Sequence, residues 1–229
     1  MSAVIPANNE EPTVAAVVET ARRNRSIDEV IVVDDGSQDN TSKQAQRAGA
    51  EVIRLEERKG KGTAMKAGVQ KSRGDIIVFV DADLKELTTS QITSLMMPLV
   101  DGYDLCKADF DRAGGRVTEL TAKPLLKIFF PEVKHSQPLS GQKAVKRGLL
   151  NNIVLEQDFG VDIGLVIDAV MQGARVTEVY IGQLDHRSHS LQKLSGTADQ
   201  VTRTILCKAQ QYGRLNRVSP LSTCPVPVM

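Results

Sequence analysis

The chain has 229 residues, of which 41% are hydrophobic and 25% charged, a composition typical of one sizeable globular domain or of a domain with a small annex. Its formal net charge of +1 argues against a broad nucleic-acid-binding surface and leaves any basic site local. No apolar run reaches the roughly 18 residues that a membrane span requires, and no leader-like segment precedes the first predicted strand, so we expect a cytoplasmic protein without a transmembrane segment.

The first eighty residues alternate short apolar runs with segments of helical pattern. The predicted strands lie at 3–6, 29–33, 51–55 and 75–80. The predicted helices lie at 12–23, 41–48 and 63–72. This alternation predicts an α/β fold with a Rossmann-like, mostly parallel sheet flanked by helices.

The pattern changes in the second half of the chain. A further helix is predicted at 90–99, but the alternation weakens after Tyr103. An apolar helix around 120–130 and a helical stretch at 197–212 follow, and a Pro-rich tail at 220–229 is expected to be loosely held. We therefore divide the chain into segments 1–102, 103–194 and 195–229, the first two being halves of one domain.

The apolar run at 76–80 ends in two carboxylates, Asp81 and Asp83. Five consecutive Ile, Val and Phe residues indicate a strand buried on both faces, so the carboxylates emerge at its carboxyl end, where open α/β sheets bind ligands. Carboxylates are hard ligands that suit Mg²⁺ or Mn²⁺, and such ions usually complete their shells with substrate phosphates. The pair indicates a metal-bridged diphosphate, although Asp residues at a strand end also act as plain turn formers.

Three more polar segments follow predicted strands or precede helices on the same side of the sheet, where parallel strands bring their carboxyl ends together. They are 6–10, 34–37 and 60–62. Asp34 and Asp35 could accept hydrogen bonds from a nucleobase or ribose, or could form a turn before a helix cap at Asn40. Lys61, between two glycines, can approach a diphosphate, or could belong to a solvated basic loop.

The order of these motifs, Pro-Ala-x-Asn-Glu, Asp-Asp-Gly-Ser, Gly-Lys-Gly and Asp-x-Asp, resembles the GT-A nucleotide-sugar glycosyltransferases, a group that includes the family-two enzymes. The second half is most similar to the glucosyl-3-phosphoglycerate synthases and the related mannosyl-3-phosphoglycerate synthases. That closer match rests on segments 115–120, 138–141, 159–164 and 186–187, and the resemblance extends to about residue 191. It implies a GT-A fold in which 1–102 binds the nucleotide sugar and 103–194 forms a smaller acceptor-side subdomain.

The resemblance also implies roles for individual residues on the donor side. Those assigned to the uridine diphosphate and sugar are Pro6, Ala7, Asn8, Asn9, Glu10, Asp35, Ser37, Lys61, Asp81 and Ala82. Asp83 and His186 would be the protein ligands of the metal. Sequence alone favours a surface or packing role for a single His, so His186 rests on the resemblance, and its imidazole suits Mn²⁺ better than Mg²⁺.

On the acceptor side, Gly115, Arg116 and Thr118 match the loop that grips the phosphate and carboxylate of 3-phosphoglycerate in that family. A planar guanidinium can pair bidentately with an oxyanion, whereas the alternative is a helix start capped by Thr118 and Glu119. Asp162 stands where the family has a Glu near the reacting sugar, and it could position the acceptor hydroxyl or stabilise positive charge. Gly141, Gly160 and Ser188 complete the predicted substrate site. Gln142 and Ser188 replace an expected Glu and Asn.

The resemblance implies a metal-dependent transfer of a sugar, expected to be glucose from UDP-glucose, to a small anionic acceptor such as 3-phosphoglycerate, with retention of configuration. The open alternatives are a family-two transferase with a lipid-phosphate or other polyol acceptor, a sugar nucleotidyltransferase and a silent sugar-nucleotide binder. A Gly-rich phosphate loop after the first strand is missing, which disfavours the nucleotidyltransferase.

The three cysteines, Cys106, Cys207 and Cys224, are widely spaced, which fits a reducing compartment. A helix within 195–212 could support a homodimer.

Overall fold

The computed structural model describes residues 1–111, 115–184 and 191–215. Its strands are β1 (Ser2–Ala7), β2 (Glu29–Asp34), β3 (Glu51–Arg54), β4 (Ile76–Phe79), β5 (Leu105–Asp109), β6 (Lys143–Lys146) and β7 (Val176–Tyr180). Its helices are α1 (Val14–Arg23), α2 (Thr41–Arg47), α3 (Lys61–Lys71), α4 (Thr89–Val100), α5 (Lys123–Phe129), α6 (Arg147–Leu150), α7 (Val161–Met171) and α8 (Leu191–Gln211), with a π-helical turn at Thr118–Ala122 before α5.

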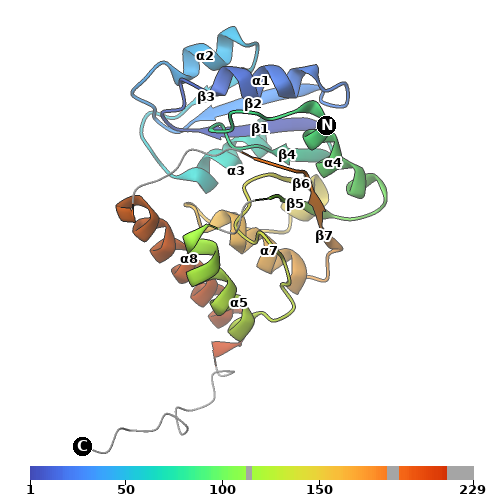
Figure 1. Cartoon of the computed structure of the whole chain (residues 1–229), viewed down its shortest axis with the longest axis vertical. Coiled ribbons are helices and arrows are strands. Elements are labelled where there is room, and N and C mark those ends of the chain that lie inside the picture. The colour runs from blue at the N-terminus through green and yellow to red at the C-terminus, as the bar shows by residue number, and fades with distance from the viewer. Residues whose placement is uncertain (112–114, 185–190, 216–229) are drawn as a thin grey trace, which may run out of the picture.

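The described strands form one sheet in the order β3-β2-β1-β4-β6-β5-β7, with helices on both faces (Figure 1). β6 runs antiparallel to its neighbours β4 and β5, and the other pairings are parallel. The prediction of a mostly parallel α/β sheet is therefore confirmed. Because β6 is reversed, its amino end lies at the same edge as the carboxyl ends of the other strands.

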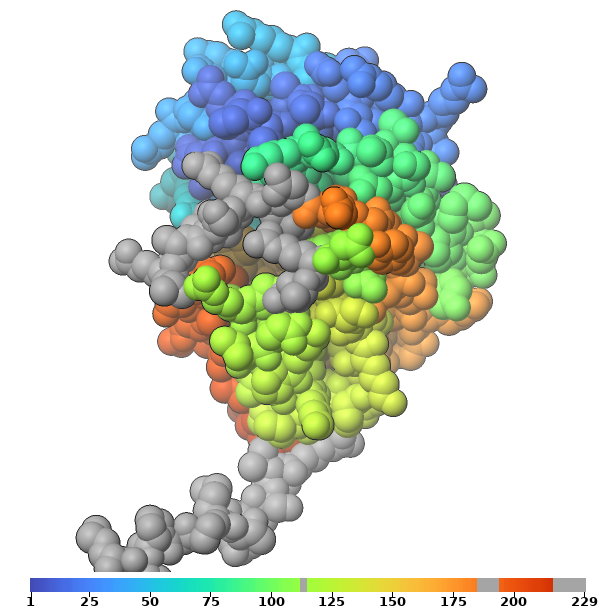
Figure 2. Space-filling view, in the orientation of Figure 1, coloured from blue at the N-terminus to red at the C-terminus, as the bar shows by residue number. Residues whose placement is uncertain are grey.

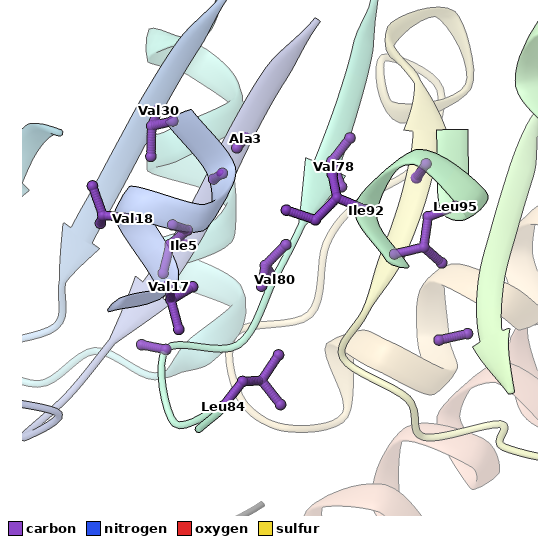
Figure 3. Packing of buried hydrophobic residues seen from close by; sticks show 14 of the residues in the cluster. Ala3, Ile5, Val17, Val18, Val30, Val78, Val80, Leu84, Ile92 and Leu95 are labelled. Carbon is purple, nitrogen blue, oxygen red and sulfur yellow. The ribbon is translucent and has the colours of Figure 1, made fainter. Parts of the chain in front are cut away.

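Helices α1 and α4 cover one face of this sheet. The buried positions of α1 recur at helical spacing, at Val14, Val17, Val18 and Ala21. Figure 3 shows Val17 of α1 and Ile92 of α4 beside the strand residues Ile5 and Val78, and all four belong to one buried cluster. A capping box between the Thr88 and Gln91 side chains and backbones fixes the start of α4.

Helices α3 and α7 cover the opposite face. Met65 of α3 and Leu165 of α7 pack with Val4, Ile77 and Phe79 of the central strands. Successive strand residues point to opposite faces, and both faces of β1 and β4 are buried. This double burial explains the continuous apolar runs from which the strands were predicted.

A second layer of helices extends the fold beyond the sheet. Phe129 and Phe130 pack with Ile167 of α7 and Ile205 of α8, which joins α5, α7 and α8 in one cluster. Figures 1 and 2 show α5 and α8 at the opposite end of the molecule from α1 and α2. These helices therefore form a layer next to the sheet. The division of the chain at residues 102 and 194 remains a prediction.

The strands of the second half were not assigned from sequence. β5 and β6 contain the fully buried lysines Lys107 and Lys143, which interrupt the apolar alternation that marks a strand. α7 is buried around nearly its whole circumference, so its sequence carries no polar face.

Within the described ranges, none of the helices has the length and hydropathy needed to cross a membrane. Cys106 and Cys207 are unpaired, and Cys224 lies outside the described residues.

Candidate active site

A pocket of about 430 Å³ opens at the carboxyl edge of the sheet, where the loops after β1, β2 and β4 meet the starts of α3 and α7. Most of the residues selected from sequence line it. They are Pro6, Ala7, Asn8, Glu10, Asp35, Lys61, Asp81, Ala82, Asp83, Gly115, Arg116, Thr118, Gly141 and Asp162. The fold thus brings the donor-side and acceptor-side motifs into one cavity.

Three other predicted residues are not part of the pocket lining. Asn9 and Ser37 join the β1 and β2 loops, because the Asn9 backbone N–H donates to Ser37 Oγ at 2.9 Å. Asn9 also adopts a left-handed conformation, with φ of 58°. Gly160 lies under α8, where a Cβ atom would stand 1.9 Å from Thr204 Oγ1. These residues shape the neighbouring loops, and the predicted His186 and Ser188 lie outside the described residues.

Lys61 is at the centre of the charged residues of the pocket. It is the first residue of α3, and its Nζ lies 2.7 Å from Asp81 Oδ1 and 2.8 Å from Asp162 Oδ2. Burial opposes its positive charge, but the two carboxylates outweigh burial and raise the pKa of Lys61. Lys61 is therefore a fixed cation facing the cavity.

Asp162 occupies the first turn of α7 and is almost fully buried. Its Oδ2 accepts from Lys61, and its Oδ1 accepts from Lys143, a lysine of β6 with no exposed surface. Burial favours the neutral acid, but the two ammonium groups prevail and lower the pKa of Asp162 to about 2. Asp162 is thus an ionised hydrogen-bond acceptor at neutral pH, and it cannot serve there as a proton donor.

Asp81 is held by groups from both halves of the site. Lys61 binds its Oδ1, and Gln142 Nε2 donates to its Oδ2 at 2.9 Å. Gly141 allows this close approach, because a Cβ atom there would lie 1.9 Å from Asp81 Oδ2. Gln142 therefore fits this site as an amide donor to a carboxylate.

The two carboxylates at the end of β2 organise loops. Asp35 Oδ1 and Oδ2 accept from the backbone N–H groups of Lys59 and Gly60, at 2.6 and 2.9 Å, and so hold the segment that leads into Lys61. Asp34 is buried and accepts from the Ser37 backbone N–H at 2.8 Å. Asp34 thus forms the predicted turn, although Asn40 makes no side-chain capping hydrogen bond. Asp35 lines the pocket, and its hydrogen bond to a nucleobase or ribose stays a prediction.

The acceptor-side wall begins at Gly115 and Arg116. Arg116 is exposed and lines the pocket just before the π-helical turn, whereas Thr118 is buried in that turn. Thr118 is the first residue inside that turn, and the N-cap position is occupied by Val117, which makes no side-chain capping hydrogen bond. The structure thus brings the Arg116 side chain to the same cavity as Lys61.

Several pocket residues were not selected from sequence. They are Arg58, Ala64, Phe110, Gln137, Leu139, Ser140, Phe159 and Leu194, and Gln142 was noted only as a departure from the family pattern. Arg58 belongs to the basic loop before Lys61, so its charge was a usable signal. Phe110 follows β5 at the same sheet edge, but the position of that strand could not be predicted.

Two charged groups outside the pocket, the partly buried Glu178 and the fully buried Lys107, hold the start of the 137–142 segment that walls it. Glu178 of β7 accepts from the backbone N–H groups of Ser136 and Gln137, at 2.7 and 3.1 Å. Lys107 Nζ donates to the Pro138 carbonyl oxygen. Burial and the like charge of Lys143 lower the pKa of Lys107 to about 7.

The described part of the pocket offers oxygen ligands to a cation. Asp83 lines the cavity beside Asp81, whose two oxygens are already bonded to Lys61 and Gln142. No group of three or more His, Cys, Asp or Glu side chains that could hold a metal occurs within residues 1–111, 115–184 and 191–215. A carboxylate in a pocket with room for a diphosphate fits a divalent ion that takes its remaining ligands from substrate and water.

Comparisons with known proteins give a consistent result. The model of Glycosyl transferase family 2 matches residues 2–148. Glucosyl-3-phosphoglycerate synthase of Mycolicibacterium smegmatis is 37% identical over 91% of this chain and 77% of its own length.

Solved structures of glucosyl-3-phosphoglycerate synthase from Mycobacterium tuberculosis are also similar. One was determined with phosphoglyceric acid and another with Mn²⁺, UDP-glucose and phosphoglyceric acid. Each matches this chain with a TM-score of 0.87 and 36% sequence identity, over 91% of this chain and 79% of the solved one. The similarity therefore extends through both walls of the pocket.

Proposed function

The chain belongs to glycosyl transferase family 2 and, within it, to the glucosyl-3-phosphoglycerate synthases, and from this premise we propose that it transfers glucose from UDP-glucose to 3-phosphoglycerate. The observation that carries the proposal is the convergence of Lys61, Asp81 and Asp162 with Arg116 on one cavity. A donor with a diphosphate and an anionic acceptor both find cationic partners there.

On the donor side, the Lys61 ammonium faces the diphosphate, and Asp81 fixes that ammonium from the end of β4. We assign Asp83 to a divalent metal, Mn²⁺ or Mg²⁺, together with His186 from beyond the described residues. When bound, such an ion neutralises the charge that builds up on the leaving diphosphate. The fixed Lys61 charge stabilises the same leaving group without rearrangement during the reaction.

On the acceptor side, Arg116 is exposed at the pocket mouth and can pair with the phosphate or carboxylate of 3-phosphoglycerate. Its backbone is placed by the π-helical turn that begins at Thr118. A cation in the pocket wall favours an anionic acceptor over a neutral polyol.

Asp162 lies between the two sides. With its pKa lowered to about 2 by Lys143 and Lys61, it is a weak base, so we assign it to orient the acceptor hydroxyl and to stabilise positive charge on the sugar. This role fits transfer with retention, in which the acceptor attacks the face from which the diphosphate departs.

We also propose that the protein works in the cytoplasm and as a homodimer. The unpaired Cys106 and Cys207 support a reducing compartment. The dimer rests on the frequency of such assemblies, and light scattering of the purified chain measures it directly.

The test measures release of the nucleoside diphosphate from UDP- and GDP-sugars with Mn²⁺, each with and without 3-phosphoglycerate. We expect UDP release that requires both UDP-glucose and 3-phosphoglycerate. Arg116→Ala should raise the KM for 3-phosphoglycerate about tenfold or more and leave the KM for UDP-glucose within about threefold. Donor hydrolysis that 3-phosphoglycerate does not stimulate would reject this acceptor.

A further inference from the structure

Charges alternate along a row of side chains that runs from the pocket into the core. Asp81 contacts Lys61, Lys61 contacts Asp162, and Asp162 contacts Lys143. The first three line the pocket, whereas Lys143 does not and has no exposed surface. The assigned roles leave this buried lysine without a function.

We propose that Lys143 is a positioning residue that holds the Asp162 carboxylate from beneath, so that the charge of Lys61 remains available to the donor diphosphate. This inference rests on the proposed function, which supplies the diphosphate. In this role Lys143 does not contact the substrate, and it affects the reaction only through Asp162 and Lys61.

The charge balance of the row supports this role. Without Lys143, the single ammonium of Lys61 would face two carboxylates, Asp81 and Asp162, and this row of side chains would carry a net negative charge before the diphosphate arrived. Inside a protein, such an unpaired charge is poorly screened and repels a second anion. Lys143 supplies the second cation from the side away from the cavity, where it cannot block the substrate.

The geometry of Asp162 supports it as well. Lys61 and Lys143 bind different oxygens of this carboxylate, which fixes its plane and its rotation about the Cβ–Cγ bond. Lys61 alone would leave that rotation free. An acceptor hydroxyl that binds to Asp162 needs a carboxylate held in one orientation, because small misplacements of reacting groups are costly.

Other charged groups near this row have different partners. Lys107 of β5 faces Lys143 and donates to the Pro138 carbonyl oxygen, and Glu178 of β7 is bonded to the 136–137 backbone. Burial, and the like charge of Lys61, lower the pKa of Lys143, while Asp162 opposes both. The charged state of Lys143 therefore depends on Asp162, as the ionised state of Asp162 depends on Lys143.

The test compares Lys143→Met with Lys146→Met, a control from the same strand. Lys146 also pairs with an aspartate, Asp104, at 3.2 Å, but it is partly exposed and does not line the pocket. We expect Lys143→Met to lower kcat about 100-fold and to keep the KM for 3-phosphoglycerate within about threefold, because Arg116 is untouched. The acid limb of its kcat profile should move to higher pH, since Asp162 retains one neighbouring cation. Lys146→Met should behave as the parent protein.

A folded Lys143→Met with unchanged kcat and pH profile overturns the proposal, and so does an equal loss in Lys146→Met. If Lys143→Met fails to fold, the folding of the double variant Lys143→Met with Asp162→Asn tests the proposal instead. Recovery of the fold supports the pairing, because neutral Asn needs no cation. Failure of the double variant to fold overturns it, because Lys143 would then be required irrespective of Asp162.

An NMR titration of the Asp162 carboxyl ¹³C signal tests the Lys143–Asp162 pair without substrate. We expect Asp162 to protonate at a higher pH in Lys143→Met than in the parent protein, and an unchanged titration overturns the proposal. A parent protein that shows no transfer to 3-phosphoglycerate would reject the proposed function alone, because this titration does not depend on turnover.

Discussion

Glu178→Gln tests how the pocket wall is held. Glu178 accepts two backbone hydrogen bonds, from Ser136 and Gln137, and lies 3.8 Å from the His135 ring nitrogen Nδ1. Burial opposes its ionisation, but the His135 side chain and these N–H groups prevail and lower the pKa of Glu178 from its ordinary 4.5 to about 2. The neutral amide of Gln can accept through one oxygen only, so one N–H loses its partner.

The pKa sets the size of the effect. A fall from 4.5 to about 2 corresponds to about 3 kcal/mol of folding free energy at neutral pH. Because the Glu178 side chain is 15% exposed and water reaches part of it, we expect about 2 kcal/mol. For a chain of this size, that loss lowers Tm by about 5 °C.

The sign of the pH dependence follows from the lowered pKa. The folded state binds the Glu178 proton less readily than the unfolded state, so the stabilisation is complete above about pH 4.5 and is lost as the pH falls toward 2. Urea unfolding of the parent and Glu178→Gln, followed by circular dichroism from pH 3 to 7, measures it. The difference in unfolding free energy should be largest at pH 7 and shrink below pH 4.5.

Glu19→Gln is the control, because Glu19 forms an exposed helical ion pair with Arg23 and should change stability by less than about 0.5 kcal/mol. A difference for Glu178→Gln that is absent at pH 7, or the same at pH 3 and pH 7, would refute the reasoning.

Two further substitutions test the donor site. Asp83→Asn should abolish Mn²⁺-dependent turnover of UDP-glucose and leave Tm within about 2 °C. The substitution exchanges one carboxylate oxygen for an amide nitrogen, so it removes a metal ligand without changing side-chain volume. Activity equal to that of the parent protein would reject the metal assignment. Gly141→Ala places a Cβ atom 1.9 Å from Asp81 Oδ2, so Asp81 must leave Lys61 or Gln142, and kcat should fall about 100-fold. Gly148→Ala, where no atom lies within 4 Å of the added Cβ, is its control, and steady-state kinetics showing equal losses in both variants would contradict the steric argument.

The first half of the fold could be predicted from local sequence. The strands β1, β2, β3 and β4 and the helices between them agree with the prediction within a few residues. For β1, β2 and β4 the reason is that both faces of a central strand are buried, so its sequence is mostly apolar, whereas β3 is a partly exposed edge strand. The same rule located Asp81 and Asp83, since the carboxyl ends of parallel strands lie at one edge.

The helices expected at 90–99, 120–130 and 197–212 are also found, as α4, as the π-helical turn with α5, and as α8. The strands of the second half, however, could not be predicted in this way. Gly141 and Gln142 reach the pocket because β6 runs opposite to its neighbours, and strand direction leaves no local trace in the sequence. They were noted only through a resemblance to known enzymes. The same resemblance gave Arg116, which the fold brings to the pocket, and His186, which lies beyond the described residues.

The sequence by itself thus determined the α/β class, the sheet edge that holds the site and the place of Asp81 and Asp83 at that edge, of which Asp83 is the proposed metal ligand. Only the tertiary structure decided which charges meet. Lys61 and Asp162 are 101 residues apart, and Lys143 reaches Asp162 from a strand that was not predicted. Hydrophobic periodicity reports whether a local segment is buried, but an ion pair between distant segments depends on chain direction, strand order and helix placement, which are properties of the whole fold.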